Sequence, residues 1–115
     1  MSLSIVDELI NNKNKDVLLI QALSKNGDDN TVVRIINFNL QSNNKRLSEL
    51  FVAFINDNEY GIATHHGDND LYHITVEVKG VTVRENILCI SGFICSLAIL
   101  FKMEFLGWGT EVEPY

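Results

Sequence analysis

The periodicity of hydrophobic and polar positions changes several times along the chain, and each change predicts a new element. Five apolar residues recur at the spacing of one helical face: Leu47, Leu50, Phe51, Phe54 and Ile55. They predict an amphipathic helix with one side toward the core. From Leu71 to Lys79 apolar and polar residues alternate strictly, which is typical of a strand with one buried and one wet face. Residues 31–40 are rich in β-branched side chains, which favours a central strand.

Two more helical regions are predicted from composition and capping signals. Asp16 is interpreted as the cap of an N-terminal helix, with a shorter helix over residues 4–11 before it. A long apolar stretch predicts a buried helix at about residues 84–101. Thr82, with Glu85 three residues later, has the pattern of a capping box for that helix.

The remaining segments complete an alternating order of elements. Short strands are predicted at residues 60–65 and 104–111, with a hairpin turn at residues 66–70. The order is then an N-terminal helix followed by βαββαβ, which is the split βαβ or ferredoxin-like arrangement. This predicts an α+β sandwich, with two helices on one face of a four-stranded antiparallel sheet of strand order 4-1-3-2.

Length and charge limit the possible organisation and partners. The chain has 115 residues, which suits a single domain over residues 1–115. Within it we expect an N-terminal helical segment at 1–27 and a βαββαβ core at 31–113. With 15 acidic and 9 basic residues the net charge is -6, and the basic residues are scattered. Because such a surface repels phosphate backbones, no direct nucleic-acid binding is expected.

The cysteines and the most apolar segment indicate a cytoplasmic protein. Cys89 and Cys95 are six residues apart in the predicted helix, about 9 Å along its axis, which is too far for a relaxed disulfide. We therefore expect two reduced thiols, as in a reducing cytosol. The apolar run at residues 87–101 is shorter than the ~20 residues that span a membrane. The first residues also lack the pattern of a signal peptide.

A cluster of histidines and acids is the one candidate for metal chemistry. It comprises His65, His66, Asp68, Asp70 and His73. His65 and His66 point to opposite faces if they lie on a strand, and the two acids are common turn residues. We expect a polar hairpin here, and no metal or other cofactor.

Features of nucleophilic or phosphate-binding enzymes are not evident. Both cysteines lie in an apolar helix, where burial raises the pKa of a thiol. No G-x-S-x-G motif occurs, and Gly107-Trp108-Gly109 does not open a helix as a nucleotide-binding loop does. We therefore expect a protein that is not an enzyme. Its wet strand face, formed by His73, Thr75, Glu77 and Lys79, is the predicted surface for a protein partner.

The segment from Glu104 to Glu111 carries the most distinctive motif of the sequence, Gly107-Trp108-Gly109-Thr110. It resembles the end of the regulator of ribonuclease activity B (RraB) family, in which an acid and an aromatic residue precede a similar element. The leucine-rich helix followed by Gly27-Asp28-Asp29 is also similar. The resemblance implies the same α/β sandwich, and binding to ribonuclease E that inhibits its endonuclease activity. Trp108 itself is interpreted as closing the edge of the core.

Two features depart from that family, and two other functions remain open. Asn37 stands where the family often has a histidine, and no long acidic tail follows the motif. The alternatives are a small-molecule or metal-binding domain that uses His65, His66 and His73, and a toxin-neutralising binding protein.

Overall fold

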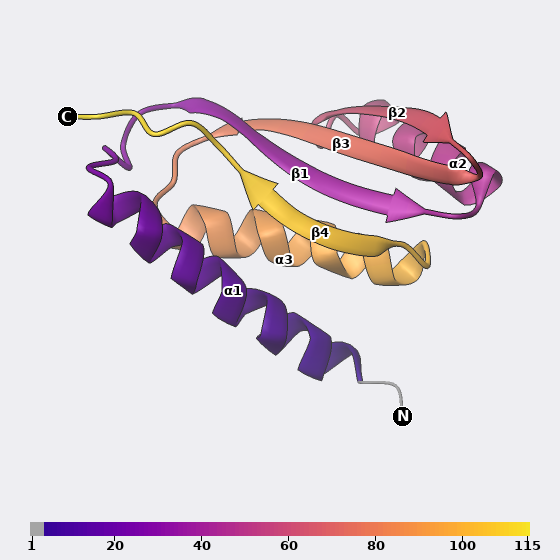
Figure 1. Ribbon diagram of the computed structural model, residues 1–115, viewed down its shortest axis with the longest axis horizontal. Coiled ribbons are helices and arrows are strands. Elements are labelled where there is room, and N and C mark those ends of the chain that lie inside the picture. The colour runs from indigo at the N-terminus through magenta and orange to yellow at the C-terminus, as the bar shows by residue number, and fades with distance from the viewer. Residues whose placement is uncertain (1–3) are drawn as a thin grey trace.

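The computed structural model describes residues 4–115, which contain three helices and four strands. In chain order they are α1 (Ile5–Lys25), β1 (Arg34–Ser42), α2 (Lys45–Asp57), β2 (Ile62–Asp68), β3 (Leu71–Gly80), α3 (Arg84–Leu100) and β4 (Glu104–Gly109). The predicted order, a helix followed by βαββαβ, is confirmed (Figure 1).

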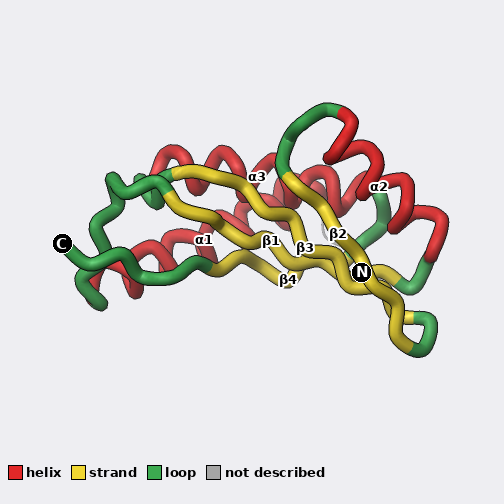
Figure 2. Tube along the Cα trace, turned by 90° about the horizontal axis from the view of Figure 1, so that it is seen from above, coloured by secondary structure: helices red, strands yellow, loops and turns green. Residues whose placement is uncertain are grey.

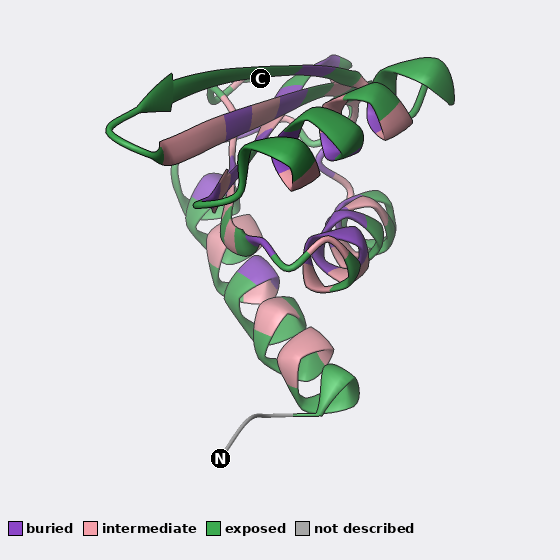
Figure 3. Cartoon of the chain, turned by 90° about the vertical axis from the view of Figure 1, so that its right-hand side faces the viewer, coloured by how far each residue is buried: buried purple, intermediate pink, exposed green. Residues whose placement is uncertain are grey.

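The four strands form one antiparallel sheet in the order β2-β3-β1-β4. This is the predicted order read from the opposite edge, and the α+β class is confirmed. All three helices lie on one side of the sheet, as the side view of Figure 3 shows. Viewed from above in Figure 2, the strands lie in front of the helices, so the other face of the sheet carries no helix. The N-terminal helix α1 packs mainly against α3.

The core lies between the sheet and helices α2 and α3. Its fully buried apolar side chains come from all of these elements: Ile36, Phe38, Leu40, Phe51, Ile55, Ile74, Val76, Ile87 and Ile94. Each contributes about 1.5–3 kcal/mol through burial. The alternation in β3 and the helical periodicity in α2 therefore predicted the correct buried faces, because burial is what imposes those two periods.

Two predicted caps are wrong. Helix α1 is continuous from Ile5, and Ser4 caps it by accepting a 3.1 Å hydrogen bond from the backbone N–H of Asp7. Asp16 therefore lies in mid-helix. At α3 the N-cap is Val83, which makes no side-chain cap, and the Thr82 hydroxyl bonds to Asp28 instead. In both cases a distant polar partner competes for a side chain that the local pattern assigns to a helix end.

The central hairpin is tighter than predicted. Strand β2 continues to Asp68, and the turn consists of Asn69 and Asp70 alone. Both have positive φ, 50° and 65°, as a two-residue type I′ hairpin requires. Consequently His66 lies within β2 rather than in the turn. The ends of the other strands also shift, because β1 runs to Ser42 and β4 ends at Gly109.

The side chain of Asn56, near the end of α2, pairs with the backbone of edge strand β2. Its Nδ2 donates to the carbonyl of Ala63 at 3.0 Å, and its Oδ1 accepts from the Ala63 N–H at 2.8 Å. The amide group thus occupies the outer edge of β2 as a neighbouring strand would.

Helix α3 is 17 residues long and apolar around most of its circumference. Among residues 4–115, the structure contains no helix with both the length and the apolar character that a membrane crossing demands.

Candidate functional site

The open face of the sheet is the side that bears no helix, and it is lined largely by amide, hydroxyl and imidazole groups. Its side chains are Ile35, Asn37, Asn39 and Gln41 from β1, Ile62, Thr64 and His66 from β2, and His73, Thr75, Glu77 and Lys79 from β3. The pairing register aligns them in rows across the sheet, with Asn39 beside Thr75 and Gln41 beside His73.

The four residues predicted to face a partner all belong to this surface. They alternate with Tyr72, Ile74, Val76 and Val78, which face the helices. The contributions of β1 and β2 were missed. Asn37 and Asn39 alternate with buried Ile36 and Phe38, so an alternating pattern was present in residues 34–42. It was obscured because Ile35 places an apolar side chain on the open face, directly before buried Ile36.

Hydrogen bonds between neighbouring strands hold part of the open face in place. The Thr75 hydroxyl donates to Asn39 Oδ1 at 3.3 Å, and Gln41 Nε2 donates to Glu104 at 2.7 Å. Toward the other end the surface becomes apolar, where Ile35 and Ile62 are 41% and 63% exposed. A depression of about 490 Å³ adjoins them and continues past Tyr60.

The predicted histidine cluster separates into two parts. His66 and His73 are cross-strand neighbours on the open face, with ring centroids 5.5 Å apart. His65 pairs with Ile74 in the register and therefore points to the other side of the sheet, as predicted. Within residues 4–115, three or more His, Cys, Asp or Glu side chains nowhere gather as a metal site would need.

The terminal motif places its tryptophan against the N-terminal helix. Trp108 is 8% exposed, and its Nε1 donates to Asp16 Oδ1 at 2.9 Å. Asn12 Nδ2 lies 3.4 Å from the other carboxylate oxygen and donates to Ser91 Oγ at 3.0 Å. Burial raises the pKa of the Asp16 carboxyl, and the hydrogen bonds from Ser91 and Trp108 oppose that rise only in part. This network joins α1, α3 and β4.

The other motif residues shape the end of β4. Gly107 has a φ of +107°, a conformation that favours glycine, and it follows an irregularity in the β1–β4 register. The hydroxyl of Thr110 donates to the carbonyl of Ile35 at 2.9 Å. The motif therefore has a structural part in the fold, consistent with the interpretation of Trp108 as the edge of the core.

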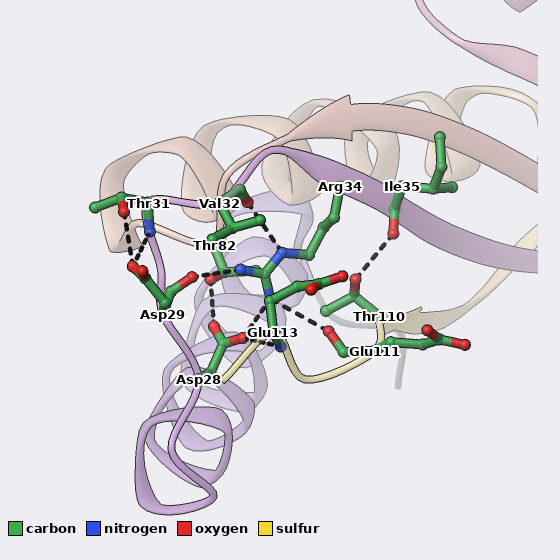
Figure 4. Close-up of polar contacts among 10 residues, drawn as sticks. All are labelled: Asp28, Asp29, Thr31, Val32, Arg34, Ile35, Thr82, Thr110, Glu111 and Glu113. Atoms are coloured by element: carbon green, nitrogen blue, oxygen red, sulfur yellow. Dashed lines mark hydrogen bonds and ion pairs between the residues drawn. The ribbon is translucent and has the colours of Figure 1, made fainter. Parts of the chain in front are cut away.

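A buried ion pair, shown in Figure 4, was not anticipated from the sequence. Arg34 and Asp28 are 7% and 5% exposed and bond directly to each other. Asp28 also accepts from the Glu113 backbone N–H at 2.9 Å and from the Thr82 hydroxyl at 2.7 Å. Arg34 donates in addition to the Glu111 carbonyl at 3.2 Å.

These bonds determine the charge state of Asp28 and connect distant segments. Burial alone would raise the pKa of this carboxyl, but the hydrogen bonds from Glu113, Arg34 and Thr82 outweigh it and lower the pKa. The network fastens the loop after α1, the loop before α3 and the segment after β4 to the beginning of β1 (Figure 4). Because nearly all of its groups are satisfied by one another, we assign it a structural role.

The two cysteines are free thiols, as predicted. Cys89 is exposed and Cys95 is buried. Burial raises the pKa of the Cys95 thiol. The thiol therefore stays protonated and is less nucleophilic than a thiolate.

No protein-family model matches this sequence, and no curated protein matches it. The resemblance to the RraB family therefore rests on the Gly107–Thr110 motif and on the order of the elements.

Proposed function

We propose that this chain is a cytoplasmic protein-binding regulator of the RraB kind, which inhibits ribonuclease E by direct contact and performs no catalysis itself. In this proposal the α+β sandwich is of the ferredoxin-like type. The observation that carries the proposal is the arrangement of the helices: all three lie on one side of the sheet, which leaves a broad open face for another protein.

The chemistry of the open face supports binding to a protein. Amide and hydroxyl groups such as Asn37, Asn39 and Thr75 both donate and accept hydrogen bonds, so they can pair with backbone and polar groups of a partner. Exposed Ile35 and Ile62 add apolar area at one end. A polar surface with an apolar portion is the usual composition of non-obligate interfaces.

Net charge supports the choice of a basic partner surface. At -6 the chain attracts positively charged surfaces at long range, and salt weakens this attraction because the Debye length is only about 8 Å at physiological ionic strength. We expect the complex with ribonuclease E to form faster at low salt than at moderate salt.

The test measures binding of the purified chain to purified ribonuclease E, together with inhibition of RNA cleavage. The test variant is N39R/T75R, which places two bulky cations in the middle of the open face. The control is Glu49→Arg on α2, an exposed position away from the open face, where the change also adds a cation. We expect at least a tenfold loss of affinity for N39R/T75R and wild-type affinity for the control.

Two results would contradict parts of the proposal. If the wild-type chain neither binds nor inhibits ribonuclease E, that partner is wrong, and binding to a toxin would favour the neutralising alternative. If N39R/T75R inhibits as well as wild type, the open face is not the contact surface.

A further inference from the structure

We propose that two copies of this chain associate through the exposed side of α2, with the two α2 helices antiparallel about a two-fold axis. The centre of the contact is formed by Arg46, Leu50, Ala53 and Asp57 of each copy. This surface lies on the helix side of the sheet, so the inference does not depend on the open face or on the partner proposed above.

These four residues form one stripe along the outside of α2. They are spaced by four, three and four positions, which places them on one side of an α-helix. All four are exposed, and Leu50 is 46% exposed. The opposite side of α2 packs on strands β1, β2 and β3, and Figure 2 shows the helix at the outer side of the helix layer. The stripe is therefore accessible to another molecule.

The order of residues in the stripe is complementary to itself when the helix is reversed. Arg46 and Asp57 are its two ends, about 16 Å apart along the axis at 1.5 Å per residue. Leu50 and Ala53 lie between them, at equal distances from the midpoint. In an antiparallel pair, Arg46 of each copy meets Asp57 of the other, and each Leu50 meets the smaller Ala53. A two-fold interface requires this kind of self-complementary surface.

The charges at the two ends of the stripe have no ionic partner in their own chain. Lys45 and Glu49 form an ion pair with each other on the neighbouring side of α2. Within residues 4–115, Arg46 and Asp57 form no ion pair. A second α2 in the reverse direction supplies an opposite charge to both, which is the charge complementarity that selects one partner and one orientation.

The charges of α2 also oppose the dipole of the helix. Acidic residues are favourable in the first turn of a helix and basic residues in the last, which is the arrangement that α1 has. Helix α2 instead begins with Lys45 and Arg46, has no acid in its first turn, and ends at Asp57 with no base in its last turn. An antiparallel second helix compensates for this order, because its negative C-terminal end lies beside Arg46 and its positive N-terminal end beside Asp57.

Exposed apolar side chains extend the surface from α2 toward α3. Phe54, one turn after Leu50, contacts Tyr60 with ring centroids 5.7 Å apart. Tyr60 in turn contacts Phe93 of α3 at 5.1 Å, and these two rings are 44% and 42% exposed. Leu100, seven residues after Phe93 and so on the same side of α3, is 70% exposed. Apolar surface gathered in this way is typical of interaction sites.

The test measures the mass of the purified full chain by sedimentation equilibrium, from micromolar to millimolar concentration. We expect a monomer–dimer equilibrium for the wild type. The R46D and D57R variants each place like charges together at both ends of the contact, so each alone should weaken dimerisation at least tenfold. Both changes bring α2 closer to the order that its dipole favours, so a less stable helix would not explain the loss.

An equimolar mixture of R46D and D57R tests the antiparallel pairing. In a mixed dimer one chain has only acids and the other only bases at the two positions, so opposite charges meet at both ends. Dimers should therefore return to wild-type strength in the mixture, and also in the double variant R46D/D57R.

Two control variants should dimerise as the wild type does. Arg84→Asp makes the same change as R46D in the first turn of α3, at an exposed position nine residues before Phe93 and so on the opposite side of that helix. The open-face variant N39R/T75R separates this interface from the surface in the proposed function.

The proposal is overturned if the wild type is monomeric at every concentration, or if R46D and D57R dimerise without loss. It is equally overturned if both variants are monomeric and mixing them restores no dimer, because the two ends of α2 then do not meet. Loss of dimers in N39R/T75R would place the contact on the open face and also overturn it.

Discussion

Trp108 and Asp16 are separated by 92 residues in the sequence and joined by a 2.9 Å hydrogen bond from the indole Nε1 to the carboxylate Oδ1. The bond connects the last strand to the first helix, and the acceptor is a carboxylate with 3% exposure. Two opposing requirements meet at Asp16: the indole needs an acceptor, while burial disfavours the negative charge.

Two substitutions of Asp16 test the hydrogen-bond acceptor and the buried charge separately. Asp16→Ala leaves the buried indole N–H without an acceptor and should cost about 1–3 kcal/mol. Asp16→Asn retains a carbonyl acceptor and removes the charge, so its cost at neutral pH should be smaller. Urea unfolding of both variants measures the difference, and an equal loss for the two would contradict this account.

The wild type and Asp16→Asn should differ in how their stability depends on pH. The folded pKa of Asp16 is raised above its usual 3.8, so the folded state holds the proton to higher pH than the unfolded state. Stability of the wild type should therefore fall as pH rises from about 3.8 through the folded pKa, whereas Asp16→Asn lacks this loss. A stability difference that stays constant from pH 3 to 7 would be the contrary result.

Trp108 should be required for folding. Trp108→Ala removes a buried indole and should cost about 3–5 kcal/mol. Trp108→Phe keeps most of the apolar volume and loses the hydrogen bond to Asp16, so it should cost less. Thermal unfolding followed by circular dichroism tests both. Unchanged melting of Trp108→Ala would mean that the residue acts as an exposed contact instead.

The buried pair of Arg34 and Asp28 should make the fold sensitive to acid. Asp28→Asn leaves the buried guanidinium without its anionic partner, at a cost of about 3–5 kcal/mol at pH 7. Because the folded pKa of Asp28 lies below 3.8, this stabilisation is complete above that value and is lost as pH falls through the folded pKa. The unfolding free energies of the wild type and Asp28→Asn should therefore converge as the pH is lowered. A difference in stability that stays constant at low pH would contradict the lowered pKa of Asp28.

The two thiols should react at different rates. In the native protein Cys89 is exposed and should be alkylated by iodoacetamide quickly, while Cys95 should react only after denaturation. Mass spectrometry of timed samples distinguishes one modification from two. Rapid double modification under native conditions would show that α3 opens readily.

Much of the fold could be predicted because burial imposes a regular period on the chain. The alternation of Ile74 and Val76 with Thr75 and Glu77 predicted both faces of β3, and the spacing of Phe51 and Ile55 predicted the buried side of α2. The open face followed from the same alternation. The prediction covered β3 alone, and the residues that β1 and β2 contribute to the open face were missed.

The polar networks could not be predicted, since their partners are distant in sequence. Asp16 and Thr82 have the local pattern of helix caps, yet their hydrogen bonds go to Trp108 and Asp28 across the fold. A single sequence contains no period that connects such residues. The hairpin turn was assigned too broadly for a related reason, because Gly67 and Asp68 are common turn residues but here lie in β2.

The amide of Asn56 has a consequence for the behaviour of the protein at high concentration. Free strand edges are templates on which further copies of a chain can stack, and the amide already fills the hydrogen-bonding positions of Ala63. An Asn56→Leu chain would expose those positions beside an apolar side chain. Such a chain would be prone to self-association through its β2 edges, although its own sheet would be intact.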